Sequence, residues 1–208
     1  KDQMLFKRDG FLLLKSFLKV DEIESYRETI DAILGLPVGS HKIRHAAKTT
    51  HTLADGVTKS PQLWPLIFDP KLLKVIRGLI GTDIRYTQHS DIHINLPGGR
   101  WHRDNAHREF NQGADWQEDK KAYGVLRVAI YLSDFNSSGS SLLILPGSHR
   151  KETGLHRREY VIWNKLRSFA RKKNWNEYLP HLFLSRPYLR VKTLPGDCLV
   201  FDQRIMHA

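Results

Sequence analysis

A short motif, His102-Arg103-Asp104, together with a distant histidine, His207, places the strongest constraint on how this chain can fold. Side chains of an extended strand alternate between two faces, so His102 and Asp104 point to the same side. An imidazole and a carboxylate that converge in this way provide two ligands for a divalent metal ion. His207, which follows the segment 195–202, is the best candidate for the third ligand, so the fold must bring both regions together.

Two histidines and one carboxylate on one side of a metal leave the opposite positions open, which suits non-haem Fe(II) that binds an oxo-acid and O2. The spacing alone does not identify the site, because the chain has 11 histidines. His89-Ser90-Asp91 and His107-Arg108-Glu109 repeat the same spacing. Context favours His102 and Asp104: an aromatic residue, Trp101, precedes them, and a Pro-Gly-Gly turn lies upstream at 97–99.

The order of the apolar patterns predicts helices first and antiparallel strands afterwards. Helices are expected at 21–34, after Ser60-Pro61 and from Pro70 to residue 80. Strands are expected at 11–14, about 42–52, 83–95, 124–132, 141–145, 188–193 and 198–201, the last two forming a hairpin. The prediction is a mainly β fold with flanking helices, built on a double-stranded β-helix (jelly-roll, cupin-like) core.

We expect one domain over residues 1–208, with a helical N-terminal part at about 1–81 and the jelly-roll core at about 82–208. A basic helical insertion is expected at about 151–187, where Lys and Arg interleave with aromatic residues. Three roles are open for the segment 151–173: a solvated helix packed on the sheet, a lid over the site, or a contact with an anionic surface.

The charge balance favours anionic partners. The chain has 33 Lys and Arg against 22 Asp and Glu, a formal net charge of +11. Carboxylated or phosphorylated small molecules, lipid surfaces and nucleic acid all fit this charge. No apolar run approaches the roughly 20 residues that a transmembrane helix needs. The single cysteine, Cys198, excludes an internal disulfide and fits a cytoplasmic location.

Five sequence elements, in the same order, resemble the phytanoyl-CoA dioxygenase-like family of Fe(II)/2-oxoglutarate oxygenases. They are Phe6-Lys7-Arg8-Asp9-Gly10-Phe11, Trp101-His102-Arg103-Asp104, Ala129-Ile130-Tyr131-Leu132-Ser133-Asp134, Leu142-Leu143-Ile144-Leu145-Pro146-Gly147-Ser148-His149, and Gly196-Asp197 to His207. The resemblance implies that His102, Asp104 and His207 bind Fe(II). It further implies a hydroxylase that consumes 2-oxoglutarate and O2 and releases succinate and CO2. Related halogenases have a small residue at the position of Asp104, so hydroxylation is favoured over halogenation.

The resemblance also implies a binding site for 2-oxoglutarate. The family usually has an arginine about ten residues beyond the distal histidine, and this position lies beyond Ala208, so we expect the chain to be truncated at its C-terminus. His93 and Asn95 occupy positions where relatives have polar cosubstrate contacts. Residues near the motifs are candidates for substrate binding: Asn105, His107, Arg108, Arg127 and Arg204. Arg127 faces either solvent or the barrel interior, and in the interior it would need an anion beside it.

The leading hypothesis is a dioxygenase for a small, anionic organic substrate. A second is an oxygenase directed to nucleic acid or to a lipid surface. Against nucleic acid, the basic residues cluster in one inserted helix, and aromatic residues interleave with them no more than a core would require. A third is a non-catalytic jelly-roll binding protein, against which the complete His/Asp/His set argues.

Overall fold

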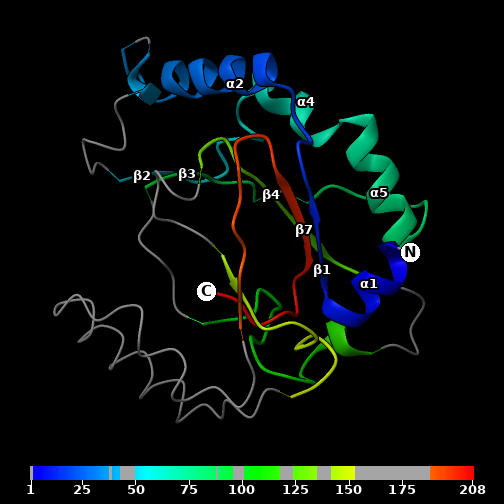
Figure 1. Cartoon of the computed structure of the whole chain (residues 1–208). Coiled ribbons are helices and arrows are strands. Elements are labelled where there is room, and N and C mark those ends of the chain that lie inside the picture. Colours follow the sequence, from blue (N-terminus) through cyan, green and yellow to red (C-terminus); the bar gives the residue numbers. More distant parts are fainter. Residues whose placement is uncertain are drawn as a thin grey trace, which may run out of the picture.

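The computed structural model describes residues 2–37, 39–42, 50–87, 89–95, 101–117, 124–134, 142–152 and 188–208. Within these ranges the strands form three antiparallel sheets, and helices lie along one side of them (Figure 1). No helix in the described ranges is long and apolar enough to cross a membrane.

The helical part contains α1 (Asp2–Asp9), α2 (Val20–Ile33), α4 (Trp64–Ile67) and α5 (Pro70–Ile80), with 3-10 turns η1 (Ser40–Lys42) and η2 (Pro61–Leu63). In the first turn of α2, the carboxylate of Glu22 accepts a hydrogen bond from the backbone of Lys19 at 2.7 Å. At the start of α5, Asp69 accepts from the backbones of Lys71 and Leu72. The helices expected at 21–34, after Ser60-Pro61 and from Pro70 are confirmed, and α1 is a further helix that the apolar pattern did not predict.

The central sheet has the strand order β1 (Phe11–Leu14), β7 (Cys198–Asp202), β4 (Leu126–Ile130). Every residue of β7 is buried, because strands flank it on both edges and side chains cover both of its faces. The other two sheets pair β2 (His51–Leu53) with β3 (Ile92–Ile94), and β5 (Leu143–Ile144) with β6 (Leu189–Arg190).

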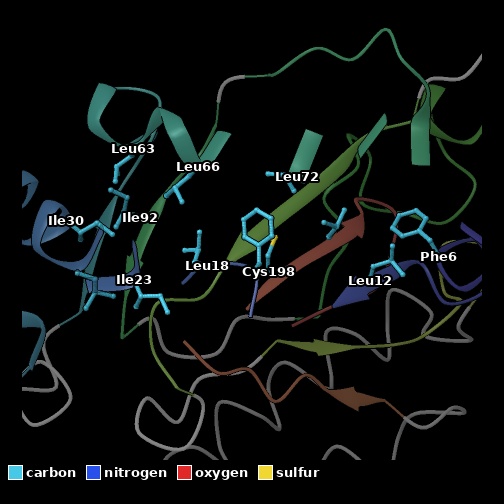
Figure 2. Close-up of a cluster of buried hydrophobic side chains, with 13 residues drawn as sticks. Phe6, Leu12, Leu18, Ile23, Ile30, Leu63, Leu66, Leu72, Ile92 and Cys198 are labelled. Carbon is cyan, nitrogen blue, oxygen red and sulfur yellow. The ribbon is translucent and has the colours of Figure 1, made fainter. Parts of the chain in front are cut away.

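The two faces of β7 contact different hydrophobic clusters. Cys198 and Val200 pack with Leu63, Leu66 and Leu72 of the helical layer, and Figure 2 shows this cluster between helices and strands. Leu199 and Phe201 point to the other side and pack with a second group that includes Ile144, Val191 and Ile205. The face of the central sheet that carries Leu199 and Phe201, its inner face, is therefore directed toward the segments that carry His102 and His207.

The hairpin expected from 188–193 and 198–201 is wrong. The two strands flank the turn Pro195-Gly196-Asp197, but β6 pairs with β5, whereas β7 pairs with β1 and β4. The turn is attached to neighbouring segments rather than closed on itself: Gly196 N–H donates to Tyr131 O, and Leu18 N–H donates to Gly196 O. These contacts direct the chain from one sheet into the other.

Other expected strands are shorter within the described residues. Of the strand expected at about 42–52, the described part contains the strand His51–Leu53, and Ser40–Lys42 is a 3-10 turn. The strand expected at 83–95 is only Ile92–Ile94. The turn 97–99 and the basic segment 153–187 lie outside the described residues.

Candidate metal centre

Backbone pairing brings the two distant motifs together. His102 N–H donates to His207 O at 2.8 Å, and His207 N–H donates to His102 O at 2.9 Å, so the two histidines form an antiparallel bridge. Two residues further on, Asp104 N–H donates to Gln203 O at 2.8 Å. His207 also bridges to Ile144, which places the C-terminal segment between the His102 segment and β5 (Figure 1).

The side chains of His102, Asp104 and His207 converge, and one ligand atom from each lies within 4.8 Å of the other two. His102 Nε2 is 3.5 Å from Asp104 Oδ1, and His207 Nε2 is 3.8 Å from Asp104 Oδ2. Two ligands that each lie about 2.1 Å from one ion are at most about 4.2 Å apart, so both distances fit a shared divalent ion. Among the described residues this is the one group of three His, Cys, Asp or Glu side chains whose ligand atoms lie within 4.8 Å of one another.

The protonation states of two of these groups suit metal binding. Burial lowers the pKa of His207 to about 4, and the neighbouring His102 lowers it further than the Asp104 carboxylate raises it. Burial alone would raise the pKa of Asp104, but the hydrogen bond from His102 and the nearby His207 and Arg127 bring it below its usual value. A neutral imidazole and an ionised carboxylate are the forms that bind metal.

The low pKa of His207 predicts a pH dependence of stability. In the unfolded chain His207 takes up a proton below its reference pKa of 6.5, whereas in the folded protein it stays neutral down to about 4. The unfolded state therefore binds more protons in this window, and stability is lost as the pH falls through it. We expect His207 to account for a loss of about 3 kcal/mol in the free energy of unfolding.

Urea unfolding of the metal-free protein between roughly pH 7 and pH 4 measures this loss. The comparison with His207→Gln isolates its contribution, because other buried groups such as His149 titrate in both proteins. We expect a shallower pH dependence for His207→Gln, and an identical dependence in the two proteins would refute the assignment.

Arg127 lies on the inner side of the sheet, beside the three converging side chains. Its Nε is 3.3 Å from Asp104 Oδ2, so the anion that an inward arginine requires is the Asp104 carboxylate. About a third of the Arg127 side chain remains exposed. The guanidinium can therefore interact with Asp104 and still present donors to a bound molecule.

Apart from Arg204, the other candidates for substrate or cosubstrate contacts divide into three groups. Asn105 is buried, and its Oδ1 has no hydrogen-bond partner among the described residues. His93, His107 and Arg108 are exposed, and the side chain of His93 leaves β3 on the face opposite Ile92 and Ile94. Asn95, with φ 52°, ends β3 in a left-handed conformation.

Arg204 is held within the protein. Its guanidinium forms an ion pair with Asp202 at 2.7 Å and donates to Asp115 O at 3.1 Å. It also lies over the ring of Trp116. These contacts give Arg204 a structural role in the turn before His207.

The two competing triplets do not form comparable sites. His89 Nε2 is 3.8 Å from Asp91 Oδ2, but the His89 side chain is 67% exposed, and Asp91 accepts a hydrogen bond from the Asp55 backbone. His107 is exposed and packs against Gly113. The choice of His102 and Asp104 over these triplets is supported by the side-chain geometry.

Two buried residues beside the site, Arg103 and Ser148, were not identified as functional from the sequence. Arg103 is 3% exposed, and Ser148 is fully buried. The alternation of side chains along an extended segment was an available signal, since it sends Arg103 to the face opposite His102 and Asp104.

Two histidines and one carboxylate that converge in this way form the ligand arrangement of non-haem Fe(II) oxygenases. The family profile of phytanoyl-CoA dioxygenase (PhyH) matches residues 6–208. The chain belongs to this family.

Known proteins of this kind resemble the chain at low identity. Ectoine dioxygenase of Bordetella bronchiseptica is 25% identical over 159 residues, which cover 70% of this chain and 48% of the relative. The chain thus spans about half the length of the curated relatives it matches.

Two solved structures share the fold. HygX from Streptomyces hygroscopicus, with nickel and 2-oxoglutarate bound, has a TM-score of 0.65 at 21% identity and covers 100% of this chain and 79% of its own. EctD from S. alaskensis, with 2-oxoglutarate and 5-hydroxyectoine, has a TM-score of 0.60 at 20% identity. The match covers 99% of this chain and 68% of the EctD chain.

Proposed function

We propose that this protein is an Fe(II)- and 2-oxoglutarate-dependent dioxygenase that hydroxylates a small organic molecule. The observation that carries the proposal is the convergence of His102, Asp104 and His207 within a chain of the phytanoyl-CoA dioxygenase family. We further propose that the three sheets belong to a double-stranded β-helix. The antiparallel pairing and the passage of the chain from β6 to β7 between sheets support this architecture.

In this proposal His102, Asp104 and His207 hold Fe(II) on one side and leave the other side open. Bound Fe(II) with 2-oxoglutarate would supply O2 activation, with release of succinate and CO2 and transfer of one oxygen atom to the substrate. The Nδ1 of His207 lies 3.0 Å from the carbonyl of Ile205. A proton on Nδ1 donates to that carbonyl, which leaves Nε2 as the ligand atom.

Arg127 is the described residue best placed to bind an anionic group near the metal, because its guanidinium is already beside Asp104 and is partly exposed. We propose that it contacts a carboxylate of the cosubstrate or the substrate. His93 and Asn95 remain proposed cosubstrate contacts, and Asn105, His107 and Arg108 proposed substrate contacts. The internal ion pair of Arg204 gives less support to a substrate role for that residue.

Two of the similar proteins are associated with small molecules: the curated relative is an ectoine dioxygenase, and HygX has been solved with hygromycin B bound. We propose a substrate of this general size, and the net charge of +11 supports an anionic one. The cytoplasmic location is part of the same proposal and is supported by the single, free and buried Cys198.

Formation of succinate from 2-oxoglutarate, stimulated by a candidate substrate, tests the proposal. The protein would be supplied with Fe(II), 2-oxoglutarate and O2 and screened against small carboxylated and phosphorylated molecules. We expect at least one compound to raise succinate formation and to gain one oxygen atom by mass. Binding of nucleic acid or anionic vesicles that weakens steeply with salt, without succinate formation, would favour the binding-protein alternative.

A further inference from the structure

We infer that Arg103, which stands between His102 and Asp104 in the sequence, is a positioning residue that fixes the spacing of the metal ligands. The inference rests on the proposed function, because ligand spacing matters only if the site holds a metal. The alternation of side chains along the segment 102–104 directs Arg103 away from the two ligands, and Arg103 is 3% exposed. It therefore acts on the ligands through the backbone.

The buried guanidinium bonds to carbonyl groups rather than to a carboxylate. Its Nε donates to Arg204 O at 2.8 Å, and its Nη2 donates to Ser148 O at 3.2 Å. Burial lowers the pKa of Arg103 to about 10, so the group is still charged at neutral pH. A buried charge is unfavourable unless it is hydrogen-bonded, and a buried carbonyl is unfavourable without a donor. The guanidinium of Arg103 and the two carbonyl groups therefore stabilise each other.

Both carbonyls belong to segments that determine where His207 lies. Arg204 is in the turn that leads from β7 to His207. Ser148 is in the turn after β5, and its hydroxyl accepts a hydrogen bond from Met206 N–H at 2.7 Å. One guanidinium therefore connects the segment of His102 and Asp104, the turn after β5 and the residues immediately before His207.

Two aromatic rings shield the hydrogen bonds of the Arg103 guanidinium from solvent. The guanidinium carbon of Arg103 lies 5.6 Å from the ring centre of Phe110 and 5.9 Å from that of Trp116. The two rings contact each other edge to face, with centres 4.6 Å apart. Hydrogen bonds in such a low-dielectric environment are stronger than the same bonds in water.

The consequence is a site whose ligand spacing is set before metal arrives. Backbone pairing between His102 and His207 fixes the two histidines relative to each other. The bonds of Arg103 hold Asp104 and the turn 203–206 in register, so that the carboxylate meets His207 at the observed 3.8 Å. Loss of an outer partner of a metal site typically weakens metal binding about 10–100-fold, and we expect this range for Arg103.

The test compares Arg103→Met, Arg103→Lys and Ser148→Ala by their affinity for Co(II) and by the visible spectrum of the bound Co(II). We expect Arg103→Met to bind Co(II) about 10–100-fold more weakly with a changed spectrum. Arg103→Lys keeps the charge and one bond, so its loss should be intermediate. Ser148→Ala removes the bond to Met206 and should shift affinity in the same direction by less.

A core variant separates positioning from general stability. Leu66→Ala, in α4 and away from the site, removes a buried side chain and should lower the unfolding temperature. Its folded form should bind Co(II) with wild-type affinity and spectrum. Equal weakening in Leu66→Ala, or wild-type binding in folded Arg103→Met, would overturn the inference. If Arg103→Met does not fold, wild-type binding in both Arg103→Lys and Ser148→Ala would overturn it.

Failure of the proposed function gives a different result. A wild-type protein that binds no Co(II) would contradict the metal site itself. A wild-type protein that binds Co(II), with Arg103 variants that bind it equally well, would contradict only the role of Arg103.

Discussion

Replacing His102, Asp104 or His207 singly by alanine should abolish succinate formation. Each provides one of three converging ligand atoms, and two protein ligands are too few to hold Fe(II) in the required geometry. We expect metal affinity to fall by more than the roughly 100-fold that loss of an outer partner costs. Circular dichroism should show that the fold is retained, because the backbone hydrogen bonds that join the His102 and His207 segments do not involve these side chains.

The matched controls are the competing residues. His89→Ala and Asp91→Ala should retain metal and activity, because the side chain of His89 is 67% exposed and neither residue belongs to the converging group. His107→Ala should also retain iron, and we expect its KM to be higher than that of the wild type, because His107 is a proposed substrate contact. An active His102→Ala protein beside an inactive His89→Ala protein would move the site to the other triplet.

Replacing Asp197 by alanine should lower the free energy of unfolding by about 3 kcal/mol. The side chain of Asp197 is buried and accepts hydrogen bonds from the Ser16 backbone at 3.0 Å, the Leu194 backbone at 2.9 Å and Lys15 Nζ at 2.7 Å. Alanine would leave two backbone N–H groups without acceptors, at a cost of about 1–3 kcal/mol each.

Urea unfolding at neutral pH measures the effect of this change. Asp197→Asn keeps one amide oxygen and should lose about half as much stability. Asp83→Ala, at an exposed position, should stay within about 0.5 kcal/mol of wild type. A stability of Asp197→Ala equal to that of Asp83→Ala would show that the turn before β7 does not depend on this carboxylate.

The elements with strong local signals were predictable from the sequence. The apolar periodicity and the acidic first turn gave α2, and Pro70 marked the start of α5. The grouping of the candidate ligands was predictable as well, since two residues of a strand separated by one share a face. Its distant member, His207, needed the order of the motifs, because no local pattern links it to residue 102.

The features that depend on distant partners were not predictable. The segments on either side of Pro195-Gly196-Asp197 look like a hairpin locally, but Tyr131, Leu18 and Ser16 bond to the turn from other parts of the chain. The orientation of Arg127 was open for the same reason. Its direction depends on the pairing of β4 with β7, which places it opposite Phe201 and close to Asp104.

An anaerobic titration with Fe(II) in the presence of 2-oxoglutarate tests the central claim most directly. When both bind at one centre, the 2-oxo acid chelates the metal and a visible charge-transfer absorption develops. We predict that the wild-type protein shows this absorption and saturates at one Fe(II) per chain, and that His207→Ala shows none. A wild-type protein without the absorption, or an undiminished absorption in His207→Ala, would contradict the assignment of His102, Asp104 and His207 as the iron ligands.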